Sequence, residues 1–137
     1  MECSMSTHNH SIAVVLFAHG SAVEEANQGV RDLAGRIQVA GSYPYVQAAF
    51  LGPGHPELGT AITQAAKAGY RRVVVLPYFL TLGIHLRRDL PKLVAEERKK
   101  HPQVKIQVGQ SLEDHPEMAS IILGRIQEVI EGIQAEP

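Results

Sequence analysis

The chain has 137 residues, of which 45% are apolar and 20% are charged, the proportions of a soluble globular protein. This length fits one domain, and a formal net charge of −1 without a basic face argues against binding nucleic acid through its phosphates. The single cysteine, Cys3, excludes an internal disulfide, and no apolar run approaches the ~20 residues that span a bilayer. We therefore expect a cytoplasmic protein that binds neither nucleic acid nor a membrane.

The N-terminal segment 1–11 lacks both the basic and the apolar parts of a secretory signal. We expect it to be a flexible tail in front of a single domain that spans residues 12–133. Within that domain, apolar segments of strand length alternate with amphipathic segments of helix length.

Four segments predict β-strands. Residues 12–18 and the centre of residues 72–77 are apolar without alternation, which is typical of strands buried on both faces of a sheet. Residues 45–51 are less uniformly apolar, and residues 104–108 alternate strictly between apolar and polar. The first and third strands should therefore lie in the centre of a sheet, with the other two at its edges.

A helix is predicted after each strand. The first starts at a capping box formed by Ser21 and Glu24, and the second opens at Glu57. The third runs from about Asp89, as its N-cap, to Lys100. A second capping box, Asp114 with Glu117, starts the last helix, whose apolar residues recur at helical spacing. These residues are Met118, Ile121, Ile122, Ile126, Val129, Ile130 and Ile133.

This alternation predicts an α/β domain with a four-stranded parallel sheet and right-handed crossovers. The strand order should be 2-1-3-4, with helices on both faces, in a three-layer, flavodoxin-like arrangement. Ligands of such sheets bind beyond the carboxyl ends of the strands, where the strand order reverses. His19 ends the first strand and His85 follows the third, so both histidines are predicted to lie at one crevice.

Two histidines at a crevice can bind a transition metal, move protons, or do both. The plainer alternatives are a strand-end His19 bonded to neighbouring backbone and a His85 exposed in the first turn of a helix. Gly20 and Ser21, at a predicted helix start, can hold a carboxylate or a phosphate. The sequence contains no Walker A loop, dinucleotide-binding G-x-G-x-x-G loop or G-x-S-x-G nucleophile elbow. A histidine phosphatase would need an arginine where Ala18 stands.

Several further elements occur together with this pair. They are His19-Gly20-Ser21, Asn27, Ala49-Phe50-Leu51, Val75-Leu76-Pro77-Tyr78-Phe79-Leu80, Gly83-Ile84-His85 and Asp89-Leu90-Pro91. Over about residues 12–130 the chain thereby resembles the CbiX/SirB group of class II tetrapyrrole metal chelatases. The most specific part is the string F-L-x-x-G-x-H-x-x-x-D-L-P at 79–91.

The resemblance implies a chelatase-like fold and the insertion of Co²⁺, or alternatively Fe²⁺ or Ni²⁺, into sirohydrochlorin without an organic cofactor. Such a reaction belongs to cobalamin or sirohaem biosynthesis. His19 and His85 would bind the metal and accept the protons of the macrocycle. The residues expected to contact the substrate are Gly20, Ser21, Tyr78, Phe79, Leu80, Leu82 and Gly83. A tetrapyrrole is broad for the crevice of one such domain, so we expect a homodimer whose second copy supplies the other wall.

One position departs from the family. Many members carry a glutamate after the Phe-Leu pair, and this chain has Gly52 there. Glu57, at the start of the following helix, and His55 of the same loop are candidates to replace it. The alternatives are a site with two histidines and a protein that has lost its activity. The alternative function is a non-catalytic protein that binds metal or tetrapyrrole, and a flavodoxin-like module that binds anions is a third.

Overall fold

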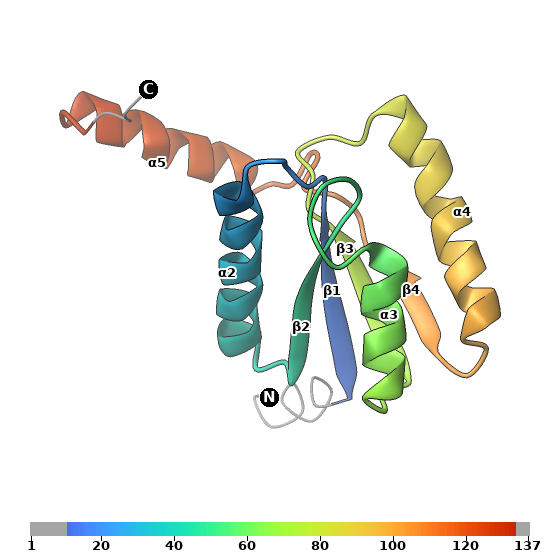
Figure 1. Cartoon of the computed structure of the whole chain (residues 1–137). Helices are drawn as coiled ribbons and strands as arrows, with labels where there is room; N and C mark the ends of the chain where they lie inside the picture. Colours follow the sequence, from blue (N-terminus) through green and yellow to red (C-terminus); the bar gives the residue numbers. More distant parts are fainter. Residues whose placement is uncertain (1–10, 134–137) are drawn as a thin grey trace.

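A computed structural model describes residues 11–133, and the tail predicted over 1–11 lies, except for Ser11, outside the described residues. The boundaries of the single domain predicted over 12–133 stay a prediction. Strands and helices alternate along the chain (Figure 1). They are β1 (Ile12–Ala18), α2 (Glu24–Gly41), β2 (Tyr45–Phe50), α3 (Leu58–Lys67), β3 (Arg72–Pro77), α4 (Ile84–Lys100), β4 (Lys105–Val108) and α5 (Met118–Ile130).

The four strands form one parallel sheet in the order β2-β1-β3-β4, which confirms the predicted fold and topology. Val15 of β1 lies beside Val75 of β3, which in turn lies beside Val108 of β4. The two most apolar strands occupy the centre, because a strand between two helix layers must be apolar on both faces. The loops that follow β1 and β3 therefore leave the same edge of the sheet side by side.

Helices α3 and α4 cover one face of the sheet, and α2 lies on the other (Figure 1). The larger hydrophobic core lies between the sheet and the α3/α4 layer. Its buried members are Ala13, Val15, Phe17, Ala49, Leu58, Ala61, Ile62, Ala65, Val73, Val75, Phe79, Leu90, Val94 and Ile106. A smaller core lies on the α2 face. Its buried members are Leu16, Ala18, Ala34, Ala48 and Phe50.

Helix α5 carries the predicted apolar residues except Ile133, which lies beyond its end at Ile130, and it extends away from the sheet (Figure 1). None of its residues is buried. Among residues 11–133, no helix is both long and apolar enough to cross a membrane.

The predicted capping boxes are wrong. Helix α2 begins at Glu24 behind the N-cap Val23, and α5 begins at Met118 behind Glu117, neither with a side-chain cap. The Ser21 hydroxyl instead accepts a hydrogen bond from the Val23 amide at 3.0 Å. This local bond competes with capping, as is common for serine.

The predicted start of α4 at Asp89 is also wrong. The helix begins at Ile84 behind an extended Gly83, which places Asp89 in its second turn and Pro91 inside it. The Asp89 carboxylate pairs with Arg88 rather than capping the helix. As a result His85 lies in the first turn of α4.

Candidate active site at the carboxyl ends of β1 and β3

Backbone hydrogen bonds hold three loops together at the carboxyl edge of the sheet. The Leu51 amide donates to the Ala18 carbonyl at 2.9 Å, and the Gly52 amide donates to the His19 carbonyl at 2.8 Å. On the other side, the Tyr78 amide donates to the carbonyl of Phe17 at 2.7 Å. The segment that carries His19 is therefore fixed between the loops that follow β2 and β3.

The turn after His19 depends on a glycine and on a buried amide. Gly20 has a φ of +89°, and a Cβ there would lie 2.3 Å from the Pro53 carbonyl oxygen. The Asn27 side chain, 2% exposed, accepts from the Ser21 amide at 2.9 Å and donates to the Ser21 carbonyl at 2.8 Å. Asn27 thus sets the shape of this turn. The sequence placed Asn27 in a helix but gave no sign of this role.

The His19 ring is exposed and lies edge-on to Phe79, with 6.2 Å between ring centroids and 65° between the ring planes. Phe79 is buried and packs in turn against Phe17, with 5.8 Å between centroids. Tyr78 and Leu80, on either side of Phe79, are exposed. Phe79 therefore connects the His19 ring to the core, and its two exposed neighbours add apolar surface to the same loop.

Polar contacts tie the loop after β3 to the segment between β4 and α5. Arg87 donates through Nε to the Leu82 carbonyl at 2.9 Å, and through Nη2 to the Glu113 carboxylate at 2.7 Å. Glu113 also accepts from the Leu82 amide at 3.3 Å, and the Leu112 amide donates to the Phe79 carbonyl at 3.0 Å. Glu113 could not be recognised from the sequence, because its partners lie about 30 residues away along the chain.

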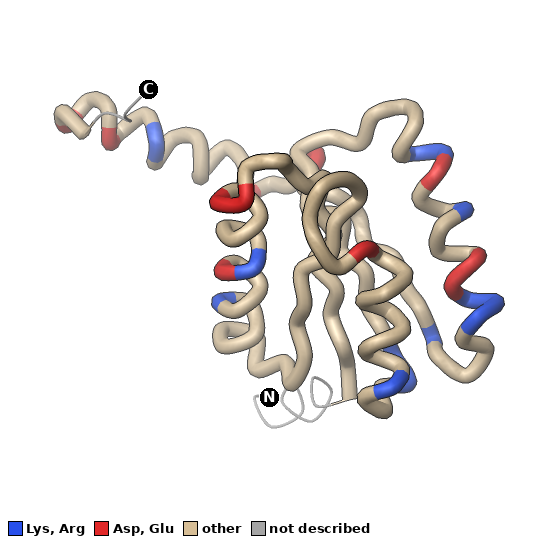
Figure 2. Tube along the Cα trace, viewed as in Figure 1, with Lys and Arg blue, Asp and Glu red and all other residues tan. Residues whose placement is uncertain are grey.

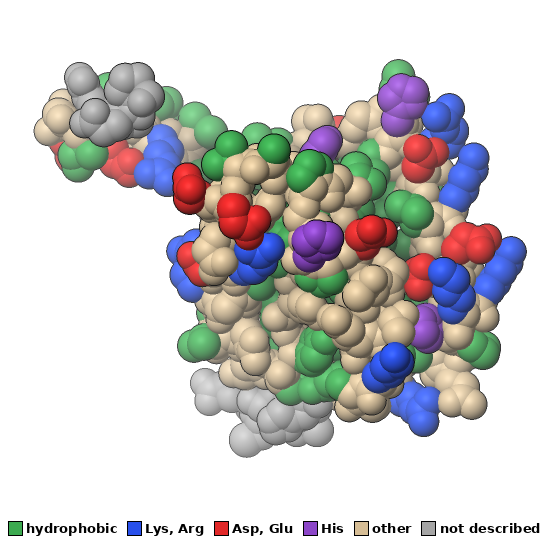
Figure 3. Space-filling model, viewed as in Figure 1, with side chains coloured by type: hydrophobic (Ala, Val, Ile, Leu, Met, Phe, Trp, Pro, Cys, Tyr) green, Lys and Arg blue, Asp and Glu red, His purple; other side chains and the backbone are tan. Residues whose placement is uncertain are grey.

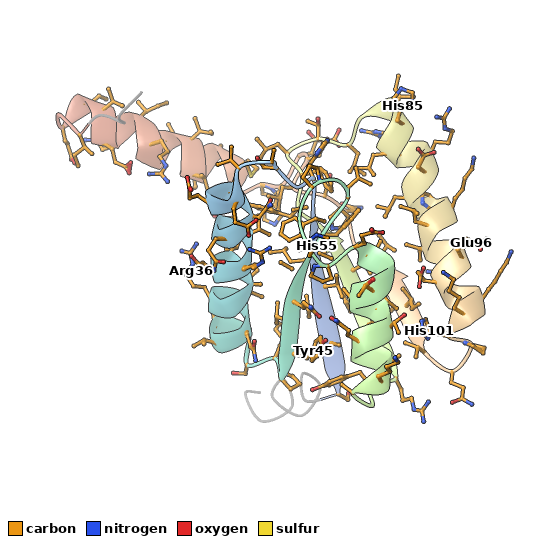
Figure 4. The ribbon with its side chains drawn as sticks, in the orientation of Figure 1. Arg36, Tyr45, His55, His85, Glu96 and His101 are labelled. Carbon is orange, nitrogen blue, oxygen red and sulfur yellow. The ribbon has the colours of Figure 1, made fainter. Side chains whose placement is uncertain are left out.

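His85 is exposed at the first turn of α4, at the same end of the sheet as the loops (Figure 4). Its Nδ1 lies 3.1 Å from an Arg88 guanidinium nitrogen. A guanidinium only donates hydrogen bonds, so Nδ1 is the acceptor in this contact and Nε2 carries the hydrogen of a neutral ring. The two histidines thus have different neighbours, Phe79 for His19 and Arg88 for His85.

The loop after β2 holds the remaining candidates. His55 is exposed and lies in front of the strands, beside the start of α3 (Figure 4), and its backbone carbonyl accepts from Arg31 at 3.3 Å. Glu57, the exposed N-cap of α3, borders a cavity of about 560 Å³ between α3 and α4. Gly52 has room for a side chain, because a Cβ there meets only the His19 carbonyl oxygen, at 3.4 Å.

The surface over these loops is mainly apolar. Figure 3 shows histidine side chains among hydrophobic ones on the upper part of this face, and Figure 2 shows few charges on the loops compared with α4. Within residues 11–133, no three His, Cys, Asp or Glu side chains come together as a metal site. The edge thus offers two imidazoles, several backbone amides and an apolar rim.

Comparisons with known proteins agree with this geometry. The CbiX family model matches residues 13–129. The chain is 35% identical to a sirohydrochlorin cobaltochelatase of Methanopyrus kandleri over 86 residues, which are 63% of its length. Over 123 residues, 90% of the chain, it is 25% identical to the chloroplastic sirohydrochlorin ferrochelatase of Arabidopsis thaliana. It spans 60% and 55% of the lengths of these relatives.

One solved structure with a similar fold is that of a protein close to this chain in length. It is a putative cobalamin biosynthesis CbiX protein from Marinobacter aquaeolei, with a TM-score of 0.77 and 26% sequence identity. The match covers 88% of this chain and 98% of that one.

Proposed function

The chain belongs to the CbiX family, and we propose that it inserts a divalent metal ion into sirohydrochlorin. Co²⁺ is the first choice of metal and Fe²⁺ the second, because the relatives carry both names, while Ni²⁺ is the third. The reaction uses no organic cofactor and takes place in the cytoplasm. Each copy of the chain contributes one domain, over residues 12–133.

The observation that carries this proposal is the position of two histidines at one edge of the sheet. His19 follows β1 directly, and His85 follows β3, which is the neighbour of β1 in the sheet. Neutral imidazoles are good ligands for Co²⁺, Fe²⁺ and Ni²⁺, and two of them leave coordination positions open for the incoming ring nitrogens. The same rings can take up the two protons that the macrocycle loses when the metal enters.

We assign the exposed apolar residues of the edge to the macrocycle. Phe79 packs edge-on against His19, Tyr78 and Leu80 are its exposed neighbours in the loop, and Leu82 and Gly83 continue the loop toward His85. The substrate also has acidic side chains that need donors.

Two of the candidate donors for those acidic side chains already have partners within the chain. The Ser21 amide already donates to Asn27, and Arg87 is bound to Glu113. We therefore assign the acidic side chains to Arg88 and to the turn at Gly20. Arg88 is half-exposed and would have to give up its contact with His85 when substrate binds.

We further propose that the active form is a homodimer. The carboxyl edge of one four-stranded sheet is small for a tetrapyrrole, which needs a wall on both sides. A second copy facing this edge would supply the other wall.

The test is an anaerobic insertion assay with sirohydrochlorin and Co²⁺, Fe²⁺ or Ni²⁺, followed by absorption spectroscopy. His19→Ala and His85→Ala should each lower the insertion rate by at least a hundredfold, whereas the control His101→Gln should keep it. His101 lies at the opposite end of α4 (Figure 4) and contacts Thr63 at 3.0 Å. Normal rates in both alanine variants would refute the proposed roles.

A second candidate function is favoured by the missing side chain at Gly52. A protein that only binds metal or tetrapyrrole would titrate with stoichiometric Co²⁺ but would form no metallated product. Turnover in the insertion assay separates the two functions.

A further inference from the structure

Helix α5 presents an apolar stripe that nothing in the described chain buries. Met118, Ile122, Ile126 and Val129 follow one another at spacings of three or four residues and so share one side of the helix. The large apolar side chains from Ile121 to Ile133 are 48–71% exposed. A soluble domain rarely leaves so large an apolar surface uncovered unless a partner covers it.

The sheet has a matching uncovered surface. In β3, Val73 and Val75 point toward α3 and α4 and are buried, whereas Val74 and Leu76 point the other way and are only partly buried. On that side, α2 packs on β2 and β1 and leaves β3 and β4 open (Figure 1). We call the surface formed by Val74, Leu76 and Gln107 the open lane. Parallel sheets are normally covered by helices on both faces, so the open lane lacks a helix.

Helix α5 fits the open lane in length. Its 13 residues extend over about 20 Å at 1.5 Å per residue. The six residues of β3 extend over a similar length, about 20 Å at 3.3 Å per residue.

Charged residues favour one direction of α5 along the open lane. Arg72 and Lys105 lie at the amino ends of β3 and β4, and Arg72 contacts Gln107 of the open lane at 2.8 Å. Glu128 and Glu131 lie at the carboxyl end of α5. A helix that enters the lane from the carboxyl edge of the sheet would bring these opposite charges together, and its own dipole would favour the same direction.

The start of α5 is held at the active-site edge. The segment in front of it is bound there by Glu113, through Arg87 and the Leu82 amide, and by the Leu112 amide, through Phe79. From this point α5 runs outward, away from its own open lane (Figure 1). A second copy that faces the same edge would lie in its path.

We infer that two copies of this chain exchange their α5 helices, each helix filling the open lane of the other copy beside its α2. The exchange buries the apolar stripe of α5 and the partly exposed residues of β3 at once. It also sets the two carboxyl edges, each with a His19 and a His85, opposite one another. The inference rests on the proposed homodimer and specifies how its two halves are joined.

Disulfide trapping in the full chain tests the exchange. In a Cys3→Ser background, one tagged copy carries Val74→Cys and a differently tagged copy carries Ile126→Cys, and the two are co-expressed and oxidised. A disulfide should link the two tags. The control Ser120→Cys, on the polar side of α5, should leave them unlinked.

Two results would overturn the exchange. A disulfide that forms within a single chain carrying both cysteines, but not between mixed chains, would show that α5 folds back onto its own lane. Absence of any disulfide, with circular dichroism showing folded protein, would show that α5 does not occupy the lane. The readout does not depend on metal insertion. A trapped dimer without insertion would therefore contradict only the proposed function, and insertion by an unlinked monomer would contradict only the exchange.

Discussion

The two faces of the sheet are built from the same strands but are buried to different extents. On the α3/α4 face, Val73 and Val75 are fully buried, together with Ile62 of α3. On the α2 face, Val74 and Leu76 of the same strand remain partly exposed. Residue type does not explain this contrast, because three of the four strand residues are valines. The difference follows from the helices, since two of them cover the first face and one covers half of the second.

The apolar surfaces that lack a covering helix therefore lie on one side of the domain. The α3/α4 face is a closed core, and its residues need no further partner. The α2 face has an open lane, and α5, the helix that could cover such a lane, leaves the domain at the edge that carries His19. Assembly and the candidate active site are therefore linked through one short segment, 109–117, between β4 and α5.

The largest effect is expected from truncation on the closed face. Ile62→Ala should lower the free energy of unfolding by about 3 kcal/mol, because it leaves a cavity among fully buried side chains. Val74→Ala in the open lane should lower the free energy of unfolding by only about 1 kcal/mol in dilute protein. Chemical denaturation of both variants measures the difference.

The losses of stability in these two variants should also depend differently on protein concentration. If a second copy covers the open lane, the cost of Val74→Ala should rise with protein concentration, while that of Ile62→Ala stays nearly constant. Equal costs at every concentration would mean that the two faces are equally covered in solution.

The next largest effect is expected at Asn27, the buried polar residue on the α2 face. Asn27→Ala leaves the Ser21 amide and carbonyl without their partner and should cost about 2 kcal/mol of unfolding free energy. It should also slow metal insertion, because the turn beside His19 loses its support. Asn27→Asp keeps the acceptor for the Ser21 amide and should be milder in both measurements. An insertion rate that is unchanged in Asn27→Ala would separate this turn from the reaction.

Much of the fold could be predicted because strand burial follows from apolar patterns. The continuous run at Val73–Leu76 and the alternation at 104–108 gave the strand order, which in turn predicted a shared edge for His19 and His85. The helix starts predicted at Ser21 and Asp89 were wrong, because these side chains bind other partners in the folded chain, the Val23 amide and Arg88. Periodicity also predicted the apolar side of α5 but not what covers it, since a sequence pattern specifies a surface and not its partner.

A smaller effect, a gain in affinity for metal, is expected from Gly52→Glu at the carboxyl edge of the sheet. The backbone there can take a side chain without a clash, and a carboxylate beside His19 would add a third ligand for a divalent metal. Affinity for Co²⁺, measured by isothermal titration calorimetry, should rise about tenfold, which corresponds to about 1.4 kcal/mol. Gly52→Gln, which has the same shape without the charge, should give little change. An equal gain from both would point to packing rather than to coordination.

The smallest effect is expected from a surface ion pair on the α2 face. Arg31 lies over the Phe50 ring, 5.4 Å from its centroid, and its hydrogen bond to Glu24 lowers the pKa of that carboxyl. A carboxyl whose pKa is lower in the folded than in the unfolded state stabilises the fold above its unfolded pKa, and this stabilisation is lost as pH falls through the folded pKa. Glu24→Gln should therefore destabilise the protein slightly at pH 7 and not at about pH 2, well below the ordinary range for a glutamate. Thermal unfolding at the two pH values, at low and high salt, measures this difference, and salt should reduce it because the pair is exposed. A loss of stability that persists at about pH 2 would mean that Glu24 stabilises the α2 face through packing and not through its charge pair with Arg31.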